Sequence, residues 1–405
     1  FSQATTKMGD SLAEFSNNLA SDLGPLLALF GESMTIQYLS ECTNIADYIV
    51  FASAPIGIIT ALVSAIRICG GTYLRAFIGR ATEGAAAAEV ELCTSTGRDV
   101  CELFTRGGIT RSLGGPRMLE LVFLRGDKGD SGVAKEGELR IYRKYLRECG
   151  EGRWPQKVRR AKSVGGEKES SGPEPDTDLP NLSLNVGIVK PPWYIFWIVA
   201  AIGVVLQTGV IALAAVDAAG LLEPLAPPEE GEEPPEGPLV RDSVLFILGT
   251  VFICFGMGSC AALIGRTTRE FVDKKRQPEK ERLLWLQPGN QKIGDQTFDC
   301  YAIFETRRQP LTQYVISTMD DRRREKMNIH VAAAALITLI GFIAQFIGIR
   351  GISAWVSIAQ LIVTIIMSLL RGMVRMQRRG KEDNELKSYD HHILGHELDW
   401  LAFNL

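Results

Sequence analysis

The stretch WYIFWIVAAIGVVLQTGVIALAAV, residues 193–216, is an uncharged apolar run that predicts a transmembrane helix. At about 1.5 Å per residue, a helix of this length crosses the roughly 30 Å hydrocarbon core of a bilayer. Four further uncharged apolar runs of spanning length occur at Tyr48–Ile66, Ser243–Ile264, Ile329–Ile349 and Ile352–Leu370. Five such runs with charged flanks predict a membrane-embedded all-α bundle of five transmembrane helices.

The average composition of the chain hides this segmentation. Apolar residues make up 46% of the 405 residues and charged residues 22%, and the formal net charge is −3, all close to the values of soluble proteins. The apolar residues are concentrated in the five runs. We therefore expect the lipid bilayer as a partner, and no nucleic acid.

Lysine and arginine residues are sorted between alternate segments of the chain. Three of the 44 lie in the segments Phe1–Asp47, Asp217–Asp242 and Arg350–Gly351. The others lie in Arg67–Pro191, Arg266–Met327 and Arg371–Leu405. Since basic residues are retained on the cytoplasmic side during insertion, the N-terminus is predicted outside and the C-terminus in the cytoplasm. The plasma membrane is the expected location, with an internal membrane as the alternative.

Two predicted outer segments have distinctive sequences. The stretch APPEEGEEPPEGP, residues 226–238, has five Glu, five Pro and no cation, so the loop 217–242 is predicted to be extended by proline and by charge repulsion. In the first segment, 1–47, the apolar residues of Asp10–Leu29 recur at three- or four-residue spacing, which predicts an amphipathic helix. Because the sequence starts at Phe1 rather than Met, either a removed leader or a longer native chain is expected.

The two long cytoplasmic segments, 67–191 and 266–327, are predicted to build one small α+β domain together, because neither holds many strands by itself. Strands are predicted at 89–93, 117–126, 138–146, 297–305 and 313–319. Helices are predicted at 94–108 and 269–286, and residues 157–178, rich in Lys, Glu, Ser, Gly and Pro, are predicted to be disordered. The last segment, 371–405, is predicted to be a cytoplasmic tail that ends in a helix.

Polar residues form a stripe along one face of the last predicted span. Its members, at intervals of four, three, four and four, are Ser353, Ser357, Gln360, Thr364 and Ser368. A second stripe, of small and polar residues in the preceding span, comprises Thr338, Gly341, Gln345 and Gly348. In one interpretation the two helices, joined by a tight turn, face each other through close packing and hydrogen bonds. In the other, the Ser/Gln/Thr stripe lines an aqueous path in an oligomer.

A histidine cluster near the C-terminus offers a metal hypothesis. In DHHILGHELDW, residues 390–400, His392 and His396 lie one helical turn apart and could share a divalent metal. Alternatively, the cluster is the solvated face of a terminal amphipathic helix. The eight cysteines form no metal or disulfide pattern, and no cofactor is expected.

Several classes of function lack their sequence signatures. The predicted spans carry no ionisable residue at mid-depth, whereas ion-coupled carriers generally need one. Asp47 and Asp217 fall at predicted outer ends, and Arg67 and Arg371 at inner ends. The motifs of P-loop nucleotide hydrolases, α/β-hydrolases, zinc metalloproteases and dinucleotide-binding folds are absent as well. The chain is therefore not expected to be an enzyme.

Four stretches carry a family resemblance: SLAEFSNNLASDLGPLLALFGESMT (11–35), APIGIITALVSAIRICG (54–70), LRAFIGRA (74–81) and ELCTSTGRDVCELF with GGITR (91–104 and 107–111). Together they resemble uncharacterised multi-span membrane proteins of filamentous fungi, some of which carry ankyrin repeats. The resemblance implies a fungal source and a membrane setting, and it assigns no site residues.

Three functions are compatible with these features. In the first, several copies form a channel-like pore lined by the stripe of the last span, and the cytoplasmic domain couples signals to opening. In the second, the bundle conducts nothing and anchors a signalling or scaffold module whose cytoplasmic domain could bind a protein partner. Both predict a homo-oligomer. The third is a uniporter for a small neutral solute.

Overall fold

The computed structural model describes a helical unit and a strand unit, and each is treated by itself. The described residues are 31–42, 44–92, 100–105, 108–114, 118–125, 137–142, 145, 192–221, 238–274, 280–304, 313–319, 326–376, 396, 399 and 402. The predicted amphipathic helix 10–29, the acidic stretch 226–237, the segment 157–178 and His392 lie outside these ranges.

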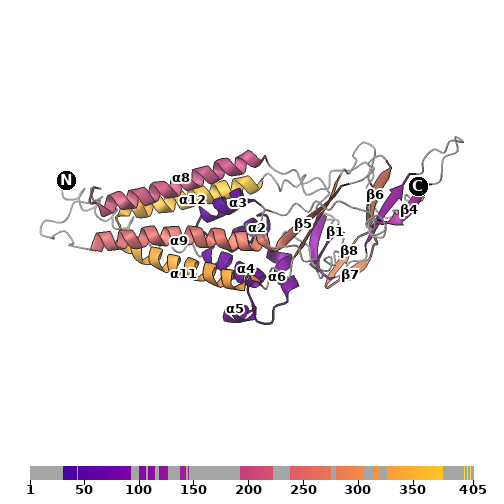
Figure 1. Cartoon of the computed structure of the whole chain (residues 1–405), viewed down its shortest axis with the longest axis horizontal. Coiled ribbons are helices and arrows are strands. Elements are labelled where there is room, and N and C mark those ends of the chain that lie inside the picture. Colours follow the sequence, from indigo (N-terminus) through magenta and orange to yellow (C-terminus); the bar gives the residue numbers. More distant parts are fainter. Residues whose placement is uncertain are drawn as a thin grey trace, which may run out of the picture. The chain divides into compact units, whose positions relative to one another are not determined.

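Four long helices run alongside one another in the helical unit (Figure 1). They are α8 (Trp193–Ala218), α9 (Pro238–Arg266), α11 (Asn328–Gly351) and α12 (Ala354–Met376). All four are long and apolar enough to cross a membrane. Four of the five predicted spans are thereby confirmed as helices, and the chain has the architecture of a multi-pass membrane protein.

Helices α9 and α11 pack antiparallel through close contacts at glycines. A Cβ added at Gly249 would collide with the backbone nitrogen of Gln345, and one at Gly256 would collide with the Thr338 side chain. Gln345 also donates from Nε2 to Thr250 Oγ1 at 3.0 Å. The stripe of α11 predicted from the sequence therefore faces α9, and the interpretation in which it faces the stripe of α12 is wrong. Small residues allow this approach, and dispersion contacts between the two helices stabilise it.

Helices α8 and α12 also run antiparallel. At one end, the Ser353 backbone N–H, just before α12, donates to Asp217 Oδ2 of α8 at 3.1 Å. Further along, Gly203 of α8 lies against Met367 of α12. The two ends of the bundle are named after residues that lie there. At the Arg266 end, α8 and α11 begin while α9 and α12 finish; the other is the Asp217 end.

Residues 48–66, predicted as the first span, are not one helix. They belong to two short helices, α3 (Ile45–Ala52) and α4 (Ile58–Cys69). The Tyr48 hydroxyl fills the space beside Gly265, at the Arg266 end, whereas Ser53 lies against Gly203 near the middle of α8. After α4, the Gly71 backbone N–H donates to Asn328 Oδ1, again at the Arg266 end, at 2.8 Å.

The chain thus enters the bundle at the Arg266 end, turns near the middle and returns to the same end. This re-entrant hairpin, Ile45–Cys69, stands in place of the first predicted span, Tyr48–Ile66, which is not confirmed. Before the hairpin, Tyr38 in α2 (Glu32–Ser40) donates to Asp47 O at 3.3 Å, which ties α2 to the first turn of α3. Two further short helices follow the hairpin, α5 (Thr72–Phe77) and α6 (Ala85–Leu92).

The strand unit is built on a four-stranded antiparallel sheet of order β4-β3-β6-β9. Its strands are β3 (Leu119–Leu124), β4 (Glu138–Ile141), β6 (Glu281–Gln287) and β9 (Tyr301–Phe304). The pairs β1 (Val100–Thr105) with β2 (Gly108–Leu113), β5 (Thr268–Lys274) with β10 (Gln313–Met319), and β7 (Gln291–Ile293) with β8 (Gln296–Phe298) complete it. Because β3 pairs with β6, both long segments contribute to one sheet, as predicted.

The two central strands of the sheet, β3 and β6, are buried on both faces. Val122, Leu283 and Trp285 lie in a cluster on one side, and Leu284 and Leu286 in a cluster on the other. The buried Gln287 side chain joins β1 to the sheet: it accepts from the Phe104 backbone N–H and donates to Phe104 O, both at 2.8 Å. An uninterrupted apolar run buried on both faces is typical of a central strand.

Three predicted elements of this region are wrong. Residues 94–108, predicted as a helix, contain β1, and 269–286 contain β5 and most of β6. Pro278 explains the second error, because it removes a backbone donor and disfavours a helix in the residue before it. Conversely, 89–93 belong largely to α6, whose start at Ala85–Ala88 is a run of the strongest helix former. The predicted strands at 117–126, 138–146, 297–305 and 313–319 are confirmed by β3, β4, β8, β9 and β10.

The glycine contacts between α9 and α11 predict a difference between two alanine variants. Gly249→Ala forces backbone away from backbone and should destabilise the protein by about 1–3 kcal/mol. Gly209→Ala, in α8, meets nothing within 4 Å. It should be neutral, or stabilising by up to about 1 kcal/mol, because alanine favours a helix. Thermal unfolding of both variants in the same detergent measures the difference, and equal unfolding temperatures would contradict the packing described.

Candidate functional site

The candidate site is centred on Ser53–Gly57, which form the tip of the re-entrant hairpin. Pro55 lacks a backbone N–H and disfavours a helical conformation at Ala54. Gly57 has a φ of +68°, which glycine adopts readily and other residues rarely do. A Cβ there would also collide with the Thr35 side chain. The apolar run therefore breaks at this point, although its composition is that of a span.

The break exposes main-chain carbonyls inside the bundle, and side chains of two other helices donate to them. Gln207 of α8 donates from Nε2 to Ser53 O at 2.9 Å. Thr35 of α2 donates from Oγ1 to Ile56 O at 3.4 Å. A buried carbonyl that loses its donor costs about 1–3 kcal/mol, so these contacts hold the tip at its depth.

A buried arginine joins α12 to α2 and to the hairpin. Arg371 is 3% exposed, and its Cζ lies 4.8 Å from the centroid of the Tyr38 ring and 4.6 Å from that of Phe51. Its Nη2 donates to Thr35 Oγ1 at 3.3 Å. Each guanidinium–ring contact contributes about 0.5–2 kcal/mol in a desolvated setting. These residues form the Arg371 clamp, which holds the half-length helices against the bundle.

The stripe of α12 predicted as a pore lining faces the interior of its own chain. Ser357, Gln360 and Thr364 are at most 6% exposed. Most of the hydroxyls donate to main-chain oxygens of α11 or α12: Ser357 to Ile349 O at 3.4 Å, Thr364 to Gln360 O at 2.8 Å and Ser368 to Thr364 O at 2.7 Å. The fifth member, Ser353, binds Asp217 through its backbone. Helix α12 lies beside α8, with Met367 against Gly203, a pairing that sequence reasoning did not predict.

Two glutamine oxygens in this interior have no hydrogen-bond donor among the described residues. They are Gln207 Oε1 and Gln360 Oε1, in side chains that are 6% and 5% exposed. The Gly203–Met367 contact and the Asp217–Ser353 hydrogen bond fix one antiparallel register between α8 and α12. In that register the two amides lie about one helical turn, roughly 5 Å, apart in depth. Mid-bundle thus holds two buried amide acceptors, and the Gln207 amide also contacts the broken backbone at Ser53.

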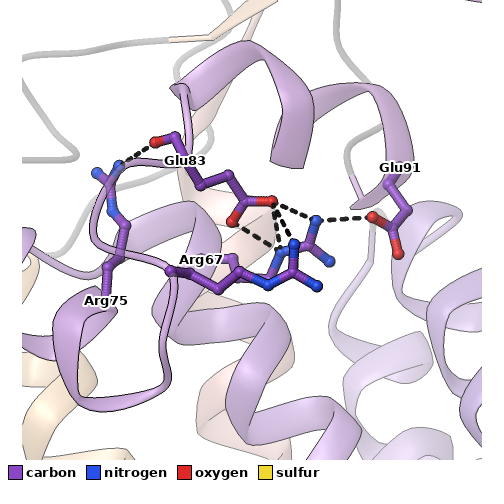
Figure 2. Close-up of polar contacts among 5 residues, drawn as sticks. Arg67, Arg75, Glu83 and Glu91 are labelled. Carbon is purple, nitrogen blue, oxygen red and sulfur yellow. Dashed lines mark hydrogen bonds and ion pairs between the residues drawn. The ribbon is translucent and has the colours of Figure 1, made fainter.

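The base of the hairpin is fixed by an ion-pair cluster (Figure 2). The Arg67 guanidinium donates to Glu83 Oε1 at 2.6 Å and to Glu91 Oε2 at 2.7 Å. Arg75 donates from Nη1 to the main-chain oxygen of Glu83 at 3.3 Å. Because the Arg67 and Glu83 side chains are each 9% exposed, this pair is screened little by water. The cluster ties the end of α4 to the loop before α6 and to α6 itself.

The histidine hypothesis is only partly covered by the described residues. His396 is exposed, and its Nδ1 lies 3.1 Å from Asp399 Oδ2. Its proposed partner His392 lies outside the described ranges. Within the described part of the chain, no group of three or more His, Cys, Asp or Glu could hold a metal ion.

Sequence reasoning missed the residues that centre the site. Pro55 and Gly57 within an apolar run are the signal that could have revealed the break, because both are unusual in an uninterrupted helix. Gln207 is the single glutamine in the run 193–216, and a polar residue at that depth marks a contact or a site. Nothing in the sequence indicates that Arg371 lies against the stacked rings of Tyr38 and Phe51.

The Arg67 cluster predicts acid sensitivity. Hydrogen bonds from Arg67 lower the pKa of the Glu83 carboxyl below its usual 4.5. Its stabilising contribution is therefore present above about pH 4.5 and is lost as the pH falls through the lower folded-state pKa. Glu83→Gln should lower the unfolding temperature near neutral pH and flatten its fall below about pH 4.5. Glu138→Gln, which removes an exposed pair with Arg140, is the matched control and should leave the wild-type pH profile. Equal profiles for Glu83→Gln and wild type would contradict the role of the cluster.

No protein-family model, curated protein or solved structure matches this chain. No residue role is therefore carried over from another protein. The chemistry of the chain has to follow from its own geometry: the hairpin tip, the Arg371 clamp and the two glutamine amides.

Proposed function

We propose that this multi-pass membrane protein lets small uncharged polar solutes cross the membrane through the interior of each chain. The path runs between α8, α12 and the re-entrant hairpin. The observation that carries the proposal is the pair of buried oxygens, Gln207 Oε1 and Gln360 Oε1, in the interior of the bundle. Each lacks a donor among the described residues, and the Gln207 side chain also donates to the broken backbone at Ser53 O.

The energetic cost of this arrangement supports a role beyond packing. A buried acceptor without a donor costs about 1–3 kcal/mol, and the cost rises in an environment of low dielectric constant. Leucine at either position would avoid it. Non-helical backbone at membrane depth is in turn tolerated only where protein covers it or where it lines a water-filled cavity. A solute that carries N–H or O–H groups supplies the hydrogen-bond donors that these two oxygens lack.

The chemistry of the lining favours an uncharged solute. An ion that leaves water for an interior of low dielectric constant loses tens of kcal/mol of solvation. Selectivity filters for cations repay that loss with rings of carbonyl or carboxylate oxygens. Here the acceptors are two amide oxygens and a few carbonyls and hydroxyls, most of them already bonded. A neutral molecule with N–H or O–H groups is the class that these acceptors can satisfy.

The position of the α12 stripe supports a path within one chain rather than along an oligomer axis. Ser357, Gln360 and Thr364 are covered by their own chain, whereas Ile362 and Leu369 on the same helix are 50% and 62% exposed. An axis formed by the exposed face of α12 would be lined by apolar side chains. The geometry therefore favours a uniporter-like protein over the ring-shaped pore expected from sequence.

In the proposed cycle, the described conformation is closed at the Arg266 end. The hairpin tip and α2 fill that half of the path, and the Arg371 clamp holds them there. Opening then requires the tip to shift at Pro55 and Gly57, where the helix is already broken. The Arg266 end is proposed to be cytoplasmic because the basic residues that flank the helices cluster there. In the same proposal the strand unit is cytoplasmic and regulates opening.

The purified chain in liposomes tests the proposal by stopped-flow light scattering with water, urea and glycerol. Gln207→Leu and Gln360→Leu should lower solute flux roughly tenfold, the factor that corresponds to about 1.4 kcal/mol. Gln345→Leu is the matched control: it makes the same change inside the bundle, but at the α9–α11 contact, and should leave the flux unchanged. Wild-type flux equal to that of empty liposomes for all three solutes would contradict the proposal and favour a non-conducting membrane-anchored scaffold.

A further inference from the structure

The short helix α5 presents two aromatic side chains to its surroundings. Tyr73 and Phe77 are 90% and 89% exposed, more than any other large hydrophobic residue that the structure describes. Their four-residue spacing places both rings on one face of the helix. Two adjacent rings in contact with water would be unfavourable, so this face calls for an apolar environment.

Polar contacts hold α5 in this orientation. Arg75 donates from Nε to Gly70 O at 3.0 Å, besides its contact with Glu83 O. The Gly71 backbone N–H, which precedes α5, donates to Asn328 Oδ1, in the first residue of α11. With its start tied to the beginning of a long apolar helix and its middle tied to the Arg67 cluster, α5 is fixed with its ring face outward.

The depth of α5 coincides with other exposed aromatic residues. At the same end of the bundle, Trp193, Tyr194 and Trp197 of α8 are 74%, 52% and 49% exposed. Tryptophan and tyrosine concentrate where the hydrocarbon core meets the headgroups, because one part of the ring system is apolar and another part is polar. Ile329, next to Asn328, is 80% exposed and continues the apolar surface of α11 toward α5. Figure 1 shows α5 on the outside of the helical bundle, close to α4.

We propose that α5 is an interfacial anchor whose partner is the phospholipid of the surrounding membrane. The helix lies in the boundary between headgroups and hydrocarbon, with the rings of Tyr73 and Phe77 among the upper parts of the acyl chains. Arg80, whose side chain is 56% exposed and 3.8 Å from Glu83, faces the phosphates from the same loop. Through the Arg67 cluster, the anchor fixes the depth of the re-entrant hairpin. The proposal is independent of the solute path, since a non-conducting bundle would use it equally.

Site-specific photocrosslinking tests the proposal in the full chain, reconstituted in vesicles of phosphatidylcholine with radiolabelled phosphatidylglycerol. A benzophenone amino acid replaces Phe77 or, as controls, Val205 or Lys292. Val205, 68% exposed on α8, marks direct lipid contact, and Lys292, an exposed residue of β7, marks a polar surface. Phe77 should give lipid adducts at a level close to Val205 and about fivefold or more above Lys292.

Two results would overturn the anchor. One is a lipid yield at position 77 no higher than at Lys292 while Val205 still reacts. The other is adducts from position 77 to a second copy of the chain in place of lipid, which would make the ring pair a protein interface. The benzophenone at Tyr73 provides a second reading in case replacement of Phe77 prevents folding, and the same yields are expected there.

Discussion

A main-chain carbonyl inside a bilayer needs a hydrogen-bond donor from the protein, because no water is present there. At the tip of the re-entrant hairpin, side chains of α8 and α2 are the donors. Pro55 and Gly57 break the helix, and Gln207 and Thr35 then donate to the exposed backbone. The presence of a glutamine in the middle of α8 follows from this need. Its amide has two ends, however, and with the nitrogen committed to Ser53 the oxygen remains available. The structural requirement of the hairpin thereby creates the polar chemistry on which the proposed path depends.

The two helix pairs of the helical unit differ in the residues at their contacts. Helices α9 and α11 meet at glycines so closely that added methyl groups collide with backbone, and this contact is suited to a rigid frame. Helices α8 and α12 instead carry hydroxyls, amides and a buried guanidinium, and the hairpin lies beside them. Arg371 lies against the stacked rings of Tyr38 and Phe51 and donates to the Thr35 hydroxyl, and these contacts stabilise the buried guanidinium. We therefore expect α8 and α12 to move relative to α9 and α11, which stay packed against each other.

The sequence predicts an element correctly where a single property, such as apolar length or helical periodicity, determines its structure. Four long helices follow from uninterrupted apolar length, and the polar face of α12 follows from helical periodicity. The prediction of a span at 48–66 fails because apolar composition is the same for a helix that crosses and for a hairpin that returns, and only Pro55 and Gly57 separate the two.

The partner of each stripe could not be predicted either, since adjacency along the chain suggested α11 with α12, whereas the glycine contacts pair α11 with α9. In the strand unit, the charged stretch 269–286 is predicted to be a helix. It forms strands instead, because Pro278 disfavours a helix and the apolar residues of β6 are buried on both faces of the sheet. The Arg371 clamp joins residues more than 300 positions apart, a contact that no local pattern contains.

The re-entrant path of the chain is the central claim, and the sidedness of its two ends tests it most directly. Single cysteines replace Ile45, Thr72 or Leu221, which are exposed at the start of the hairpin, just after its end and at the Asp217 end. A membrane-impermeant maleimide is applied to sealed vesicles of one orientation, and labelled peptides are identified by mass spectrometry. Positions 45 and 72 should react from the same side and position 221 from the opposite side. Reaction of positions 45 and 72 from opposite sides would show that the chain crosses the membrane between them and would contradict the account.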